Sequence, residues 1–273
     1  MRNRTVGAVG IAIILLMAFA ALFAGFLAPY SPYDQAGGTF EKPSRSHLLG
    51  TNDIGQDILS ELIYGTRVSL AVGALSAAVS ISVGVAVGVA SGWYGGSVDR
   101  LFAKVTSFFM TIPFLPSVII LASFSNSGIL GMSAILGLLS WTDVARVLRA
   151  STMQLRERPY IRMIRGMGAP SFYILTRHVF RELLPYILYR TVARVKSGIL
   201  AESSMSFLGI GSPVAKSWGS IIYYAQARNA LITGAWLWWI VPPGLCICAV
   251  SMGLMMLAYR METKSDSRME AEA

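Results

Sequence analysis

The sequence predicts an all-α, polytopic membrane protein with about six transmembrane helices. Of its 273 residues, 54% are hydrophobic and only 14% are charged, which is about half the charged fraction of an ordinary soluble domain. Several uncharged runs are long enough to cross a hydrocarbon layer of about 30 Å, which takes about 20 helical residues. The abundance of apolar residues excludes a disordered chain, and two cysteines are too few for a disulfide-stapled module.

The first span is expected over residues 9–27. Residues 6–33 carry no charge, and Arg2 and Arg4 precede this run. A cleaved signal peptide is the alternative, but its apolar core would cover only about 7 to 15 residues. An uncleaved helix is therefore favoured, and residues 1–67 are expected to form an N-terminal unit of one transmembrane helix and an extracytoplasmic loop.

The second uncharged run, residues 68–98, predicts the second span. Small residues recur within it every four positions and therefore line one face of a helix; they are Ser80, Gly84, Gly88 and Gly92. This spacing lets two helices approach closely in lipid. We interpret the stripe as a helix contact in preference to a ligand site.

The third and fourth spans are expected within residues 105–142. This charge-free run is too long for one helix, and a polar, turn-prone segment at residues 123–128 (SFSNSG) interrupts it. Pro113 and Pro116 fall inside the third span, where neighbouring groups or a wet cavity must compensate for the missing backbone donors. A kink beside a pathway is one interpretation of these prolines.

The fifth span is expected at residues 187–208. Arg190, Arg194 and Lys196 occupy its first turns and Glu202 its later half. Long basic side chains can extend their charged ends to the membrane interface, so this run is still compatible with a transmembrane helix.

The last uncharged run, residues 229–259, predicts the sixth span. It contains Pro242 and Pro243 and opens with three tryptophans, which are typical of an aromatic anchor at the interface; they are Trp236, Trp238 and Trp239. Residues 68–260 are thus expected to form the main transmembrane domain, followed by a short cytoplasmic tail at 261–273.

The basic residues predict the orientation. With the N-terminus inside, the inner segments hold all but five of the 23 lysines and arginines; the exceptions are Lys42, Arg45, Arg67, Lys216 and Arg228. This bias agrees with an even number of spans and with both termini in the cytoplasm. The net charge of +9 therefore indicates topology, and no nucleic-acid partner is expected.

No residue set for catalysis, metal binding or nucleotide binding is expected in the chain. His47 and His178, the two histidines, fall on opposite faces of the membrane in this topology, which disfavours a membrane-embedded enzyme. Cys246 and Cys248 have no histidine or carboxylate nearby in the sequence to complete a metal site. A G-x-x-x-x-G-K-[ST] loop is absent from the sequence, so any ATP-driven work needs a partner.

An ion-coupled secondary transporter is the second function class. Such a protein would also be helical and basic inside, but it typically shows internal repeats and several intramembrane ionisable groups. The spans here contain Glu202 and, near the inner end of the fourth span, Asp143, which we place at the interface close to Arg146. A convincing repeat is not visible in the sequence.

The most informative segment is the basic inner loop at residues 156–185. Pro159 suits a first helical position and Gly168 a helix stop, which predicts a helix over residues 159–167. Ser171 can cap a second helix. Apolar stripes are expected on both: Ile161, Ile164 and Met167 on the first, and Phe172, Leu175 and Val179 on the second. We interpret the segment as a folded hairpin that either docks a soluble partner or rests on anionic lipid headgroups.

Several separately placed motifs carry a family resemblance. They are residues 49–73 (LGTNDIGQDILSELIYGTRVSLAVG), the hairpin at 156–185, residues 201–211 (AESSMSFLGIG) and residues 217–222 (SWGSII). Together they resemble the C-type permease subunit of dipeptide, oligopeptide and nickel ABC importers, an inner-membrane component of binding-protein-dependent transport systems. The resemblance implies a non-catalytic subunit in the cytoplasmic membrane that pairs with a related permease, two cytoplasmic ATPases that bind ATP and Mg²⁺, and an external solute-binding protein.

The resemblance also implies roles for residues of the hairpin, which contains the coupling helix in that family. The residues expected to contact the ATPase are Tyr160, Arg162, Arg165, Gly168, Ala169 and His178. Gly168, Ala169, His178 and Pro185 match the family pattern. The family's Glu-Ala-Ala triplet is replaced by Arg162, Met163 and Ile164, and a usual proline by Arg181.

Substrate and pathway are less closely constrained by the sequence. Asn52 and Gln56 stand where aspartate and arginine are common in the family, which weakens assignment to a named substrate. The resemblance suggests short peptides first, with nickel or other metal complexes and small oligosaccharides as alternatives. Glu202, with Ser203 and Ser204, is expected to line the translocation pathway or its outer gate; the alternative is a charge partner for the companion permease.

Overall fold

The computed structural model is built from helices. It describes residues 2–124, 128–211 and 215–271, with side chains described between residues 7 and 262. Within these ranges β pairing is limited to one isolated bridge, between Thr51 and Asp57. The described chain is therefore all-α, as predicted.

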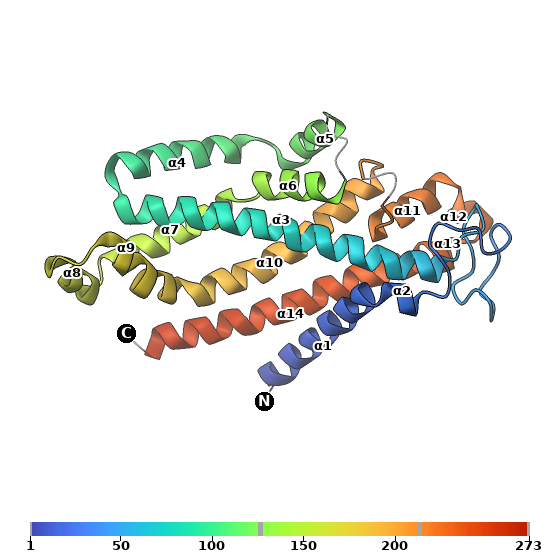
Figure 1. The fold of residues 1–273 in the computed structure, drawn as a ribbon, viewed down its shortest axis with the longest axis horizontal. Helices are drawn as coiled ribbons and strands as arrows, with labels where there is room; N and C mark the ends of the chain where they lie inside the picture. Colours follow the sequence, from blue (N-terminus) through green and yellow to red (C-terminus); the bar gives the residue numbers. More distant parts are fainter. Residues whose placement is uncertain (1, 125–127, 212–214, 272–273) are drawn as a thin grey trace.

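The central helix is α3, Ile58–Tyr94. It packs against α1, α6, α7, α10 and α11 (Figure 1). The carboxylate of Asp57 caps its start by accepting from Ser60 N at 2.8 Å. The helix thus begins ten residues before the uncharged run from which it was predicted, and the expected unit boundary after residue 67 falls inside it.

The small-residue stripe of α3 lies against α7, Thr142–Arg156. Ser80 Oγ donates to the carbonyl of Ser140 at 2.9 Å, and all three glycines of the stripe are buried. A Cβ on Gly88 would lie 2.5 Å from Ala145 O, so a side chain at this position has no room. The prediction that the stripe is a helix contact is confirmed.

The two apolar segments expected to form the third and fourth spans are both bent. Helix α4 (Gly96–Thr111) meets α5 (Phe114–Phe124) at 86°, and α6 (Ile129–Leu139) meets α7 at 47°. The first bend falls at Pro113, which cannot donate a backbone hydrogen bond. Of the turn expected at 123–128, residues 125–127 lie outside the described residues.

The inner hairpin lies at one end of the molecule (Figure 1). It begins with α8, Pro159–Gly166, which confirms the predicted first helix. The expected second short helix is not a separate element. Helix α9 (Ser171–Ile174) continues through a π-helical turn (Leu175–Val179) into α10 (Phe180–Phe207), so the hairpin is continuous with a long helix.

The opposite end carries the segment 28–57 and three short helices, α11 (Trp218–Ala227), α12 (Ala230–Thr233) and α13 (Trp236–Trp239). Trp239 is fully buried there with Ile58 and Ile221. The expected interfacial anchor is therefore wrong for Trp239, because the fold of this end covers it.

The N- and C-terminal helices pair along one side. They are α1 (Arg2–Leu22), followed by α2 (Ala24–Leu27), and α14 (Val241–Ala271). By length and apolarity, residues Ile58–Tyr94 and Trp236–Glu262 can each cross a membrane, and the count for the described residues rises to four if each bent pair is one span.

Candidate functional site

The hairpin is anchored by an apolar cluster. Ile161 of α8 is fully buried and packs with Leu155, Ile174 and Val179. The same cluster includes Trp93 at the end of α3. Through this cluster α8 contacts α3, α7 and α10, and close-packed side chains leave little room for independent movement.

Polar contacts fasten the two arms of the hairpin. The hydroxyl of Tyr160 donates to Glu182 Oε1 at 3.2 Å, and Arg158 bonds the other oxygen at 3.5 Å. His178 lies edge-on to the rings of Tyr160 and Tyr173, with ring centroids 6.2 and 5.7 Å apart. Burial, with the nearby Glu182 charge, raises the pKa of Tyr160. Tyr160 and His178 are half-buried and contact neighbouring side chains of the hairpin, and their expected contact with a partner stays a prediction.

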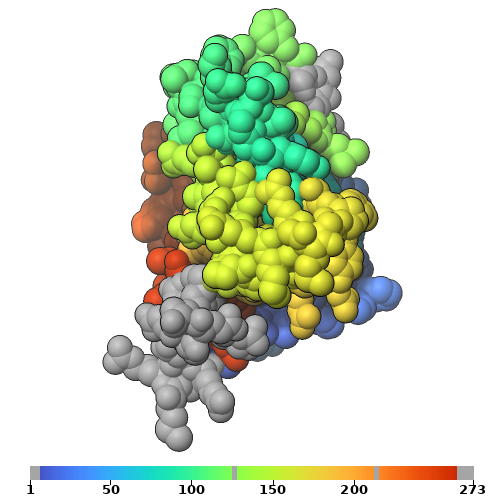
Figure 2. Space-filling model, turned by 90° about the vertical axis from the view of Figure 1, so that its left-hand side faces the viewer, coloured from blue at the N-terminus to red at the C-terminus, as the bar shows by residue number. Residues whose placement is uncertain are grey.

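A mixed basic and apolar surface faces away from the bundle. We call it the hairpin tip and define it by five exposed residues, Arg162, Met163, Arg165, Met167 and Phe172. Met163, Met167 and Phe172 are 63%, 80% and 78% exposed. Arg162 pairs with Glu157 and holds the pKa of that carboxyl below its ordinary value. Figure 2 looks onto this end, where the hairpin forms the middle of the surface.

Gly168 ends α8 in a left-handed conformation. Its φ is +87°, and its N–H donates to Arg165 O at 3.1 Å. Only glycine adopts this conformation without strain. A Cβ at this position would meet nothing within 4 Å, so the glycine is required by the backbone rather than by crowding. The next residue, Ala169, is half-buried against the apolar cluster that anchors the hairpin.

Glu202 lies in an interior cluster of hydroxyl groups. Its carboxylate accepts from Ser206 at 2.7 Å, from Ser69 at 3.1 Å and from Ser203 at 3.5 Å. Ser69 Oγ also accepts from Trp218 N at 3.2 Å, so the cluster joins α10, α3 and α11. Ser204 instead is exposed and bonds Leu200 O at 2.8 Å. The structure therefore brings Glu202 and Ser203 together and places Ser204 on a different face.

We expect replacement of Glu202 to affect stability in two distinct ways. Glu202→Leu leaves buried hydroxyls without their acceptor, which costs about 1 to 3 kcal/mol. Glu202→Gln keeps an acceptor oxygen, so its free energy of unfolding should stay within about 1 kcal/mol of that of the unchanged protein. Thermal unfolding of the detergent-purified protein measures both values. An equal loss of stability in the two variants would contradict the hydrogen-bonding role of Glu202. A normal rate of uptake by Glu202→Gln would contradict its role in the pathway.

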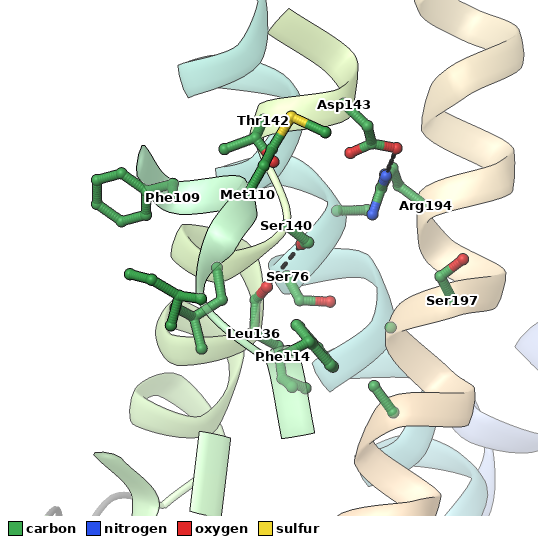
Figure 3. A pocket seen from close by; sticks show the side chains of 15 residues that line it. Ser76, Phe109, Met110, Phe114, Leu136, Ser140, Thr142, Asp143, Arg194 and Ser197 are labelled. Carbon is green, nitrogen blue, oxygen red and sulfur yellow. Dashed lines mark hydrogen bonds and ion pairs between the residues drawn. The ribbon is translucent and has the colours of Figure 1, made fainter. Parts of the chain in front are cut away.

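A cavity missed by the sequence analysis lies where the two bent segments meet α3 and α10. Its volume is about 380 Å³. Figure 3 shows Phe109, Met110 and Leu136 along its wall and an ion pair between Asp143 and Arg194 at its edge. The sequence analysis expected Asp143 at the interface close to Arg146, and Arg194 with its charged end at the interface. The structure adds that the two residues pair with each other, because α7 and α10 pack together. The available signal was an acidic residue at the inner end of the fourth expected span and basic residues in the first turns of the fifth.

Among the described residues, no three His, Cys, Asp or Glu side chains converge as a candidate metal site. His47 instead bonds Asp57 at 3.1 Å beside the start of α3.

Comparisons with known proteins identify the family to which this chain belongs. Residues 84–270 match the model of the binding-protein-dependent transport system inner membrane component, and residues 1–43 match the N-terminal transmembrane domain of oligopeptide transport permease C. The chain belongs to this inner-membrane transport family. It is an ABC transporter permease of the binding-protein-dependent class, so the resemblance seen in the motifs is confirmed.

Two relatives of this permease have named transport functions. A putative peptide permease of Brucella suis is 32% identical over 88% of this chain and 80% of its own length. The glutathione transport system permease GsiD of Pectobacterium atrosepticum is 31% identical over 83% of this chain and 76% of its own. A structure of the inward-facing MetNI methionine ABC transporter is also similar. The match covers 79% of this chain and 98% of the chain in that structure, with a TM-score of 0.55 and 19% identity, which supports the fold.

Proposed function

We propose that this permease is the non-catalytic translocation subunit of an ATP-driven importer of short peptides in the cytoplasmic membrane. Family membership supports the importer class, and the peptide and glutathione permeases among its relatives favour a peptide cargo. Nickel or other metal chelates and small oligosaccharides are the alternative cargoes of the same importer class.

The proposed topology has six spans and both termini in the cytoplasm. The spans are α1, α3, α4 with α5, α6 with α7, α10 and α14. Figure 1 places the hairpin at the end of the bundle toward which the C-terminus points, and the 28–57 segment with α11–α13 at the other end. The excess of arginine in the hairpin supports a cytoplasmic position for its end of the bundle.

The observation that carries the mechanism is the internally bonded hairpin with its exposed tip. The tip offers methionines and arginines to a partner, while Ile161 and Tyr160 anchor its inner side to the bundle. Two partner ATPases would bind ATP and Mg²⁺ and move the tip as they close. The bundle, together with a companion permease, then alternates between outward and inward openings, and an external binding protein delivers the cargo.

The first test is partnership. The permease should co-purify with an ATPase that carries a phosphate-binding loop, and reconstituted complex should take up peptide only when ATP is present. Uphill movement of peptide by the isolated chain without nucleotide would contradict the proposal and favour an ion-coupled transporter.

The second test is the helix stop at Gly168. Gly168→Ala forces a Cβ into a left-handed backbone at a cost of about 1 to 2 kcal/mol, so the hairpin end should rearrange. We expect peptide uptake and peptide-stimulated ATP hydrolysis by the complex to fall by roughly 5-fold or more.

Gly166→Ala is the matched control, because Gly166 is equally open to solvent but belongs to α8. Alanine there should favour the helix by about 1 kcal/mol and leave uptake intact. Unchanged uptake and ATP hydrolysis in Gly168→Ala would reject the coupling role of this turn.

A further inference from the structure

The cavity between the bent segments has the size and walls of a ligand site. Its volume of about 380 Å³ lies within the range of about 300 to 1,000 Å³ that is usual for small-molecule pockets. Helices α3, α4, α5, α6, α7 and α10 all contribute to its wall. Phe109, Met110 and Leu136 supply an apolar surface, and methionine adapts readily to different side chains.

Most polar groups of the wall are already occupied within their own helices. Ser76 Oγ donates to Gly73 O at 3.1 Å, Ser140 Oγ to Leu136 O at 2.6 Å, and Ser197 Oγ to Ala193 O at 3.1 Å. The strongest polar feature available to a ligand is therefore the pair of Asp143 and Arg194.

The two charges of this pair come from different helices. Asp143 lies in the first turn of α7, and Arg194 comes from α10. Their side chains are 36% and 17% exposed, and both line the cavity (Figure 3). An ionisable pair within membrane-spanning helices is expensive to keep, and its usual explanation is a role in the passage of a substrate.

We infer that this cavity is a subsite for a short peptide with free termini. Asp143 binds the α-ammonium group, and Arg194 binds the carboxylate or a backbone carbonyl, while the apolar wall accepts the side chains. The inference rests on the proposed importer function and names the part of the chain that contacts the cargo.

The chemistry of the Asp143–Arg194 pair favours short peptides over sugars and metal chelates as the cargo. When the ion pair opens, a peptide zwitterion offers an ammonium group to Asp143 and a carboxylate to Arg194, whereas a neutral sugar carries neither charge. A metal chelate needs further donor groups, whereas this wall contains one carboxylate and neither histidine nor cysteine among its described lining residues.

The competing explanation is that the pair only joins α7 to α10. Charge exchange separates the two explanations, because Asp143→Arg with Arg194→Asp keeps an ion pair between the helices but reverses the charges offered to a ligand. The experiment uses the complete complex, with companion permease, ATPases and binding protein, in proteoliposomes supplied with radiolabelled tri-L-alanine.

We expect the exchanged variant to assemble and unfold like the unchanged complex but to take up tri-L-alanine at least about ten-fold more slowly, since each exchanged residue would carry the same charge as the peptide group that it faces. Uptake within two-fold of the unchanged complex would overturn the subsite and leave a purely structural pair. No ATP-dependent uptake by the unchanged complex itself would instead overturn the proposed peptide importer, and the subsite with it.

A second variant keeps the test decisive if the exchanged pair fails to assemble. Ser197→Trp fills the cavity from α10 without altering either charge, and it should also lower uptake at least about ten-fold by excluding the peptide. Leu200→Trp is the control, because Leu200 is exposed on the same helix and outside the cavity wall. Normal uptake by assembled Ser197→Trp, or equal losses in the two tryptophan variants, would overturn the subsite.

Discussion

Gly88→Leu is expected to destabilise the protein by about 3 kcal/mol, the upper end of the range for overpacked interiors. A Cβ on Gly88 would lie 2.5 Å from Ala145 O and 3.0 Å from Leu148 Cβ, so the larger side chain must separate α3 from α7. Because α7 leads directly to the hairpin, the same separation should loosen the anchoring of Ile161. Thermal unfolding in detergent should show a midpoint roughly 10 °C lower.

Ala86→Leu is the control for this change. Ala86 is exposed two residues earlier on α3, and a substitution away from a packed surface usually changes stability by no more than about 0.5 kcal/mol. An unchanged midpoint in Gly88→Leu would show that α3 and α7 do not depend on close approach. Equal losses in Gly88→Leu and Ala86→Leu would show that added volume anywhere on α3 is harmful.

The stripe on α3 could be predicted because its information is local. Small residues four positions apart share a helix face wherever the helix lies, and close packing is the usual use of such a face in a membrane. The start of α3 could not be predicted in the same way. Glu61 interrupts the apolar pattern, but it is buried and bonded to Lys216 at 2.5 Å, a partner 155 residues away.

The hairpin shows the same division between local and distant information. Pro159 and Gly168 marked the ends of α8 to within two residues, since each acts on its own backbone. The apolar stripe expected on the second helix was wrong in part. Phe172 is exposed and Ile174 is fully buried, because burial there depends on the cluster with α3 and α7 and on the π-helical turn.

The candidate pathway residues illustrate why the site was only partly predictable. Glu202 could be recognised as a carboxylate that must face protein or water, and it does lie in the interior. Its hydroxyl partners on α3 depend on how the helices cross. The pairing of Asp143 with Arg194 depends on the packing of α7 against α10, which sequence spacing does not report.

Replacing both exposed methionines of the hairpin tip should have the largest effect on transport. Met163 and Met167 lie one turn apart, with Met167 N donating to Met163 O at 3.0 Å, and neither is needed to anchor α8. Met163→Glu with Met167→Glu removes two apolar contacts and places acids beside Arg162 and Arg165. We expect ATPase binding to weaken by about 3 kcal/mol, roughly 100-fold, and ATP-dependent uptake to be lost.

The matched variant is Met163→Leu with Met167→Leu, which keeps the apolar surface and should retain uptake. Both double variants should have the same stability as the unchanged protein, since substitutions at exposed positions seldom alter the free energy of unfolding by more than about 0.5 kcal/mol. ATPase affinity measured at fixed ionic strength separates docking from the alternative that the tip rests on lipid. If the glutamate pair binds the ATPase normally but loses activity only in vesicles of anionic lipid, the basic tip contacts headgroups and the docking surface lies elsewhere.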